Sequence, residues 1–156
     1  MLEIPVPGGK TLPIKHLILD YNGTLAQDGE LLPGVGDRLQ DLGRHLKVHV
    51  ITADTHGTVS AQLQHLSCDI KIIGANDQDL QKQEYLRNVG AENAVAVGNG
   101  RNDVLMLQEA LLGICLVQAE GASGAALRAA DIVCTDILDV LDLFLKPSRL
   151  QATLRN

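Results

Sequence analysis

Short apolar runs alternate with amphipathic segments along most of the chain, and this alternation restricts the fold more than any other feature. Six runs predict buried strands, at residues 17–19, 48–51, 70–73, 94–97, 113–117 and 132–134. Most of the segments between them carry apolar residues three and four positions apart, the spacing of one helix face. Strands joined in this way by helices and short loops form a parallel sheet. The sequence therefore predicts a single α/β domain over residues 1–156, a doubly wound parallel sheet with helices on both faces.

Two smaller features flank the first predicted strand. Apolar residues on both sides of the Pro-Gly-Gly-Lys turn at 7–10 predict an N-terminal β-hairpin at one edge of the sheet. Residues 26–32, with Asp28 and Gly29 at the turn, predict a small flap over the carboxyl end of the first strand. No helix or strand is predicted for the polar C-terminal tail, about 148–156.

Composition excludes several classes of protein. A chain with 46% hydrophobic and 21% charged residues is typical of globular proteins, and its net charge of −6 argues against a nucleic-acid partner. The apolar runs are far shorter than the ~20 residues that span a membrane, and Glu3, Pro5 and Pro7 interrupt any N-terminal signal sequence. Three scattered cysteines indicate reduced thiols. We therefore expect a cytoplasmic protein without nucleic-acid or membrane partners.

Polar side chains follow the predicted strands at their carboxyl ends, where open α/β sheets bind ligands. The residues after the first, second and fourth strands are Asp20, Asn22, Gly23 and Thr24; Thr52, Ala53 and Asp54; and Asn99, Asn102 and Asp103. Lys82 lies in the first turns of the helix predicted after the third strand, at about 77–89, and shares a face with Tyr85 and Leu86, so its ammonium could reach the same crevice. Taken singly, Asp20 could be a turn residue and Lys82 a solvated surface lysine.

Together these groups suit a phosphoryl group better than any of them does alone. A carboxylate can attack phosphorus or hold Mg²⁺, while a hydroxyl and an ammonium neutralise the phosphoryl oxygens. Glycines on both sides of Asn99 would allow the backbone to approach a metal or a phosphate closely. Five histidines, at 16, 45, 49, 56 and 65, show no metal-ligand spacing.

Four segments, in this order, resemble the haloacid dehalogenase superfamily of Mg²⁺-dependent phosphohydrolases. DYNGT at 20–24 looks like the DKTGT of P-type ATPase phosphorylation domains, and ITADTHGT at 51–58 resembles their LTGD segment. VGNGRND at 97–103 resembles GDGxND, RAADIV at 128–133 is similar to the segment that follows, and Lys82 falls where the family has its lysine. The likeness covers about residues 16–145 and is strongest to soluble, stand-alone P-type-ATPase-like proteins.

The resemblance implies a role for each matching residue. Asp20 would be the nucleophile that forms an aspartyl-phosphate, acting with Thr52 and Lys82 as the catalytic set. The implied phosphate-binding residues are Asp20, Asn22, Gly23, Thr52, Ala53 and Lys82. The implied Mg²⁺ ligands are Asp20, the backbone carbonyl of Asn22, Asn99 and Asp103, with Thr24, Asp54 and Asn102 in support.

Two departures from the family pattern lower the expected activity. Asn22 stands where phosphatases of the superfamily usually have a general acid–base aspartate, a function worth about 10² to 10⁴-fold in rate. Asn99 stands where the family normally has a metal-binding aspartate, so we expect weak Mg²⁺ binding. Turnover should be slow and the acyl-phosphate long-lived.

The spacing of the motifs leaves no room for a cap domain. Only 31 residues separate Asp20 from Thr52, and 29 separate Thr52 from Lys82. The crevice should therefore be open to a phosphorylated small molecule or macromolecule, or be covered by a second copy in a homo-oligomer. We expect a Mg²⁺-dependent phosphohydrolase; the alternatives are a regulatory or binding module with a degenerate site, and a phosphotransferase that uses a persistent aspartyl-phosphate.

Overall fold

The structure is a computed structural model that describes residues 1–54 and 57–156. Its centre is a six-stranded parallel sheet in the order β10-β9-β8-β3-β6-β7. The strands are β3 (His16–Asp20), β6 (Lys47–Thr52), β7 (Cys68–Ile72), β8 (Ala94–Gly98), β9 (Leu112–Leu116) and β10 (Ile132–Cys134). Along the sequence, β6 and β7 are added on one side of β3, and β8, β9 and β10 are then added on its other side. The predicted doubly wound α/β sheet is confirmed, and β3 lies at the point where the strand order reverses.

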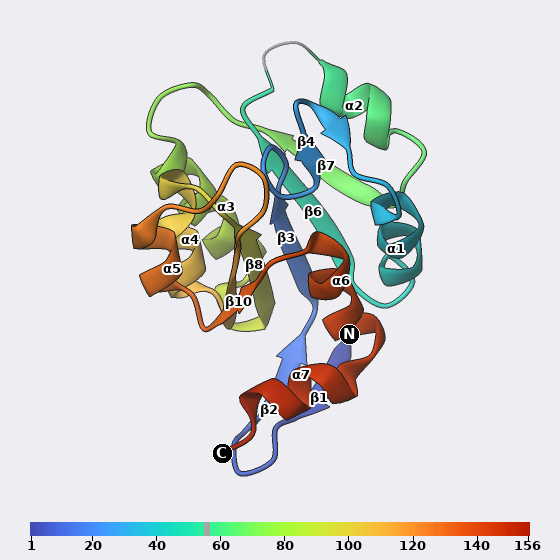
Figure 1. The fold of residues 1–156 in the computed structure, drawn as a ribbon, viewed down its shortest axis with the longest axis vertical. Coiled ribbons are helices and arrows are strands. Elements are labelled where there is room, and N and C mark those ends of the chain that lie inside the picture. Colours follow the sequence, from blue (N-terminus) through green and yellow to red (C-terminus); the bar gives the residue numbers. More distant parts are fainter. Residues whose placement is uncertain (55–56) are drawn as a thin grey trace.

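Helices cover both faces of this sheet, as Figure 1 shows for α3, α4 and α5 on one side and α1 and α6 on the other. The α-helices are α1 (Val35–Leu42), α2 (Thr58–Leu63), α3 (Gln78–Val89), α4 (Val104–Glu109), α5 (Gly124–Ala129), α6 (Ile137–Leu145) and α7 (Pro147–Leu154). Two 3₁₀ turns, η1 (Ala91–Asn93) and η2 (Arg101–Asp103), flank β8. No helix within the described ranges is long and apolar enough to cross a membrane.

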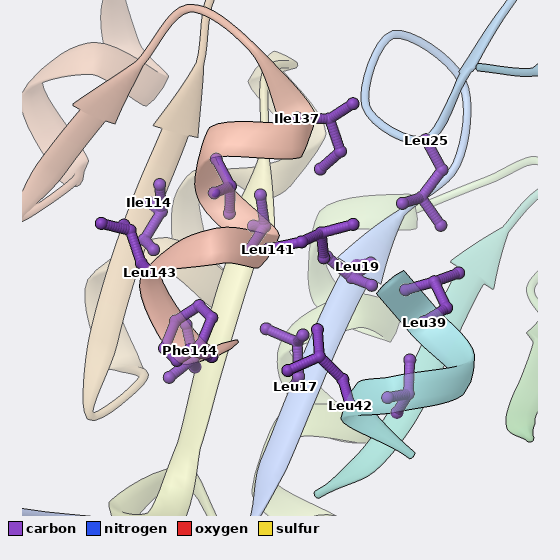
Figure 2. Packing of buried hydrophobic residues seen from close by; sticks show 14 of the residues in the cluster. Leu17, Leu19, Leu25, Leu39, Leu42, Ile114, Ile137, Leu141, Leu143 and Phe144 are labelled. Carbon is purple, nitrogen blue, oxygen red and sulfur yellow. The ribbon is translucent and has the colours of Figure 1, made fainter. Parts of the chain in front are cut away.

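The two faces of the sheet bury separate apolar clusters because successive strand residues point to opposite sides. Leu17 and Leu19 of β3 pack toward α1 and α6, and Ile18 between them belongs to the cluster under α3 and α4. Figure 2 shows the first cluster, where Leu141 of α6 and Leu39 of α1 lie over β3. This packing holds β3, and therefore Asp20 at its end, in the middle of the molecule.

The N-terminal hairpin is present, but it does not extend the central sheet. Strands β1 (Leu2–Pro5) and β2 (Thr11–Ile14) pair with each other and form a separate two-stranded sheet. The predicted place at a sheet edge was wrong because only Lys15 separates β2 from β3. Since β3 is an interior strand, a hairpin joined to it by one residue cannot reach either edge.

The C-terminal segment is ordered as α7, which the polar composition of the tail did not predict. Pro147 stands in its first turn, where proline is favoured. Leu150 is fully buried, and Gln151 Nε2 donates to the Pro5 carbonyl at 3.0 Å. Helix α7 and the hairpin therefore pack together at one end of the molecule (Figure 1).

The predicted flap is also present, as β4 (Ala26–Gln27) paired with β5 (Glu30–Leu31). Asp28 and Gly29 at its tip have φ of 51° and 82°, the left-handed conformation of a tight hairpin turn. Tyr21 Oη donates to the Gly29 carbonyl at 3.2 Å and ties the flap to the end of β3.

Candidate active site

The carboxyl ends of β3, β6 and β8 meet around a pocket of about 300 Å³. Seven of the residues singled out in the sequence line it: Asp20, Asn22, Thr52, Ala53, Lys82, Asn99 and Asn102. The other lining residues are Gln78, Gly100 and Glu120. The tertiary structure thus brings segments from five separate parts of the chain to one place.

Lys82 lies at the centre of this site and is only 1% exposed. Its Nζ donates to Asp20 Oδ1 at 2.8 Å and to Asp103 Oδ1 at 2.6 Å. Burial by itself would lower the pKa of Lys82, but the two carboxylates outweigh it and raise the pKa above its ordinary value. The amine therefore keeps its proton and places a positive charge beside Asp20.

Asp20 ends β3 with its side chain mostly buried at the floor of the pocket. Burial and the nearby Asp103 carboxylate raise the pKa of Asp20 to about 7, against the opposite effect of Lys82. Lys82 contacts the Asp20 Oδ1 atom. The arrangement is that of a carboxylate held in place by one charged partner at the end of a rigid strand.

Asp103 is fully buried and holds the loop after β8 in place. Its Oδ2 accepts hydrogen bonds from the backbone N–H groups of Asn99 at 3.0 Å and Gly100 at 2.9 Å. Its Oδ1 accepts from Lys82, and Asp103 does not line the pocket. A direct role as a metal ligand stays a prediction; the observed contacts are those of a residue that positions Lys82 and the loop.

The side chains of Asn99 and Asn102 are each fixed by one hydrogen bond. Asn99 Nδ2 donates to the Gly121 carbonyl at 3.0 Å, and both Nδ2 and Oδ1 of the amide lie over Gly23. Asn102 Nδ2 donates to Gln78 Oε1 at 2.8 Å and joins the loop after β8 to the start of α3. The supporting role expected of Asn102 stays a prediction.

Three other predicted residues lie beside the pocket without lining it. Gly23 has φ of 77° and lies under the Glu120 and Asn99 side chains, where a Cβ would collide with both. Thr24 is fully buried, and its Oγ1 has no hydrogen-bond partner within residues 1–54 and 57–156. Asp54 Oδ2 accepts from the Val59 amide at 3.1 Å in the first turn of α2, and its supporting role stays a prediction. The remainder of the ITADTHGT segment, Thr55 and His56, lies outside the described residues.

Sequence reasoning missed Glu120 and Gln78, which also line the pocket. Glu120 follows β9, so the strand-end argument applied to the fifth predicted strand would have found it. Gln78 begins α3 one turn before Lys82, and its role depends on a contact with Asn102 that no sequence pattern encodes.

The pocket offers oxygen donors, the ligands that Mg²⁺ prefers. Asp20 and Glu120 supply carboxylates, and Asn99 supplies an amide oxygen. No group of three or more His, Cys, Asp or Glu side chains in the described part of the chain is arranged as a metal site. The residues present therefore fit a hard cation that completes its coordination with backbone carbonyls, phosphate oxygens or water.

The chain is similar in sequence to proteins of Methanocaldococcus jannaschii. No family model matches the chain. The chain is 42% identical over 83 residues to an uncharacterized protein of Methanocaldococcus jannaschii, which covers 51% of this chain and 89% of the relative. It is 28% identical over 146 residues to a soluble P-type ATPase-like phosphatase of the same organism, covering 90% of this chain and 53% of the relative. The chain thus spans about half the length of that phosphatase.

Solved structures with the same fold include phosphatases. The deoxy-D-mannose-octulosonate 8-phosphate phosphatase of Haemophilus influenzae, in a cobalt-bound form, has a TM-score of 0.72 at 14% identity and covers 90% of this chain and 92% of its own. The corresponding phosphatase of Moraxella catarrhalis, in complex with magnesium and phosphate, has a TM-score of 0.69 at 20% identity with the same coverage. A HAD superfamily (subfamily III A) hydrolase of Legionella pneumophila has a TM-score of 0.69 at 18% identity and covers 91% of this chain and 87% of its own.

The TM-scores establish the fold, and the sequence match shows a likeness to a soluble P-type ATPase-like phosphatase. The chain has the haloacid dehalogenase fold and resembles the soluble P-type ATPase-like phosphatases, as its motifs predicted.

Proposed function

We propose that this protein is a slow, Mg²⁺-dependent phosphohydrolase that acts on phosphate esters or anhydrides through an aspartyl-phosphate on Asp20. The observation that carries the proposal is the buried Lys82 ammonium, hydrogen-bonded to both Asp20 and Asp103 at the floor of an open, polar pocket. Burying a lysine between two carboxylates costs desolvation free energy. At a strand end that opens on a pocket, its ammonium can stabilise the negative charge of a transferred phosphoryl group.

In the first step, an oxygen of the Asp20 carboxylate attacks phosphorus and the bond from phosphorus to the leaving oxygen breaks. Lys82 and Thr52, which line the same pocket, would neutralise and orient the phosphoryl oxygens. A bound cation would add electrostatic stabilisation of the phosphoryl charge. In the second step, water attacks the aspartyl-phosphate, which releases phosphate and restores the carboxylate.

The low rate follows from Asn22, which lines the pocket but cannot donate or accept a proton as a carboxylic acid does. The leaving oxygen must then take its proton from water, and the water that attacks the acyl-phosphate has no base at this position. The aspartyl-phosphate should therefore persist.

A second pocket of about 350 Å³ adjoins the first and provides space for the leaving group. The two pockets share Glu120, and flap residues such as Gln27 and Leu32 line the second. A small phosphorylated molecule would fit this space, and a macromolecular substrate or a second copy of the chain could cover it. The three cysteines are free thiols, which supports a cytoplasmic location.

The proposal is tested by phosphate release from a panel of phosphate esters and from acetyl phosphate, with Mg²⁺ or with EDTA. Asp20→Asn should abolish release, and Asn22→Asp should accelerate it by about tenfold or more. Asp37→Asn and Asn76→Asp, the same changes at exposed positions, serve as controls.

Two other outcomes would point to a different function. Release that requires an added acceptor would favour a phosphotransferase. An absence of release from every substrate, together with no binding of a phosphate analogue by calorimetry, would contradict the enzyme proposal and favour a binding module.

A further inference from the structure

The loop after β9 carries a carboxylate that the sequence motifs do not assign. We propose that Glu120 supplies the cation site with the negative charge that Asn99 lacks. This inference rests on the proposed function, because it assumes that a divalent cation binds in the pocket with Asp20.

The first argument is the connection between the loops after β8 and β9. Asn99 Nδ2 donates to the carbonyl of Gly121, the residue next to Glu120, at 3.0 Å. The Ser123 amide donates to the Asn99 carbonyl at 2.9 Å. These two bonds hold the start of the loop after β8 against residues 121–123, and so keep Glu120 beside Asn99.

The second argument is the space above Gly23. A Cβ placed on Gly23 would contact Glu120 Oε2 and would lie 2.7 Å from Asn99 Nδ2 and 3.0 Å from Asn99 Oδ1. The carboxylate and the amide therefore face the same small volume, directly over the DYNGT turn. Glu120, Asn99, Asn22 and Asp20 all line the same pocket.

The third argument is the charge balance. Asp20 and Asp103 share the single ammonium of Lys82, so with both carboxylates ionised this group of three carries one net negative charge. Glu120 takes part in none of the ion pairs found in residues 1–54 and 57–156. Its carboxylate adds a second negative charge at the pocket, which matches a divalent cation.

The contacts of Asn99 explain why the charge would come from Glu120. An aspartate at position 99 would direct a carboxylate oxygen at the Gly121 carbonyl, which now accepts a hydrogen bond from the amide. It would also lie close to the Glu120 carboxylate above Gly23. The amide at 99 and the carboxylate at 120 are therefore complementary.

The test is calorimetric titration of the full chain with Mg²⁺, repeated with Mn²⁺ detected by electron paramagnetic resonance. Glu120→Gln should weaken binding of both ions about tenfold, and Glu120→Asp, which keeps the charge, should retain most of the affinity. Glu84→Gln, the same change on the exposed face of α3, should have no effect. Asn99→Asp in the Glu120→Gln background should recover part of the affinity, because the aspartate replaces the charge but loses the hydrogen bond to the Gly121 carbonyl.

Unchanged affinity in Glu120→Gln, with clear binding to the wild type, would overturn this inference and leave the proposed function intact. The same holds if Glu120→Gln slows phosphate release at saturating Mg²⁺ without changing the affinity, since that result assigns proton transfer to Glu120. If the wild type binds neither ion, with or without phosphate, both this inference and the Mg²⁺ dependence of the proposed function fail.

Discussion

Lys82 Nζ donates to Asp20 Oδ1 over 2.8 Å, although 62 positions separate the two residues in the sequence. The contact exists because β3 is an interior strand and α3, which packs against α4 and η2, buries Leu86 in the same cluster as Ile18 of β3. The same ammonium reaches Asp103 in η2, so one side chain joins three segments of the chain. Stability and the proposed chemistry therefore depend on the same contacts.

Replacing this lysine should damage both properties. Lys82→Met leaves the Asp20 and Asp103 carboxylates buried without a counterion, which should cost about 3 kcal/mol of unfolding free energy. Phosphate release should fall to background. Urea denaturation and the release assay measure the two effects, and Lys71→Met, at an exposed lysine, is the control. An unfolding free energy equal to that of the wild type would show that the buried Asp20 and Asp103 carboxylates do not need Lys82 as a counterion.

Asp103 should be required for the order of the loop after β8. Asp103→Ala removes the acceptor of the Asn99 and Gly100 amides, so their protection from hydrogen exchange should decrease. Asp131→Ala is a matched control, because Asp131 Oδ2 accepts from the Gly113 amide at 2.8 Å. Asp131→Ala should reduce protection only at the Gly113 amide. If either variant reduced protection equally at Gly113 and at the Asn99 and Gly100 amides, the local role of Asp103 would be contradicted.

Gly23 and Gly29 allow backbone strain to be separated from steric conflict. Both have positive φ, 77° and 82°, so alanine at either position costs about 1–2 kcal/mol. A side chain at Gly29 meets nothing within 4 Å, whereas one at Gly23 collides with Glu120 and Asn99. Gly23→Ala should therefore destabilise the protein more than Gly29→Ala and also reduce phosphate release. Equal effects of the two substitutions in thermal unfolding and in the release assay would refute this assignment.

The buried His49 should make stability depend on pH. Its Nε2 lies 3.0 Å from His16 Nδ1, and its Nδ1 lies 2.9 Å from Tyr85 Oη. Burial, with the nearby His16 and Lys47, lowers the pKa of His49 from 6.5 to about 4, against the opposing charge of Asp69. Above pH 6.5 the imidazole is neutral in both the folded and the unfolded state. Between pH 6.5 and 4 the unfolded chain takes up a proton that the folded protein excludes, so stability is lost as the pH falls.

The expected loss from this one group is about 3 kcal/mol between pH 7 and pH 4, measured by urea denaturation at a series of pH values. His49→Gln should flatten the profile in this range, and His65→Gln, at an exposed histidine, should leave it as in the wild type. A profile of the same steepness in His49→Gln would assign the acid sensitivity to other groups.

The sequence by itself determined the class of the fold and most of the candidate site. Apolar runs and helical spacing record which side of each segment is buried, and this information is local, so strands, helices and flap could be predicted. The carboxyl ends of parallel strands share one edge of the sheet. For that reason Asp20, Thr52 and Asn99 could be placed together before any contact was known.

Only the tertiary structure decided which distant segments meet. The position of β3 inside the sheet keeps the hairpin away from both edges, and no pattern in residues 1–15 records that position. Helix α7 is held by Leu150 and by the hairpin, although its own sequence is polar. Glu120 reaches the pocket through hydrogen bonds between the loops after β8 and β9. These features come from the packing of the whole chain, whereas periodicity describes only the burial of each segment within it.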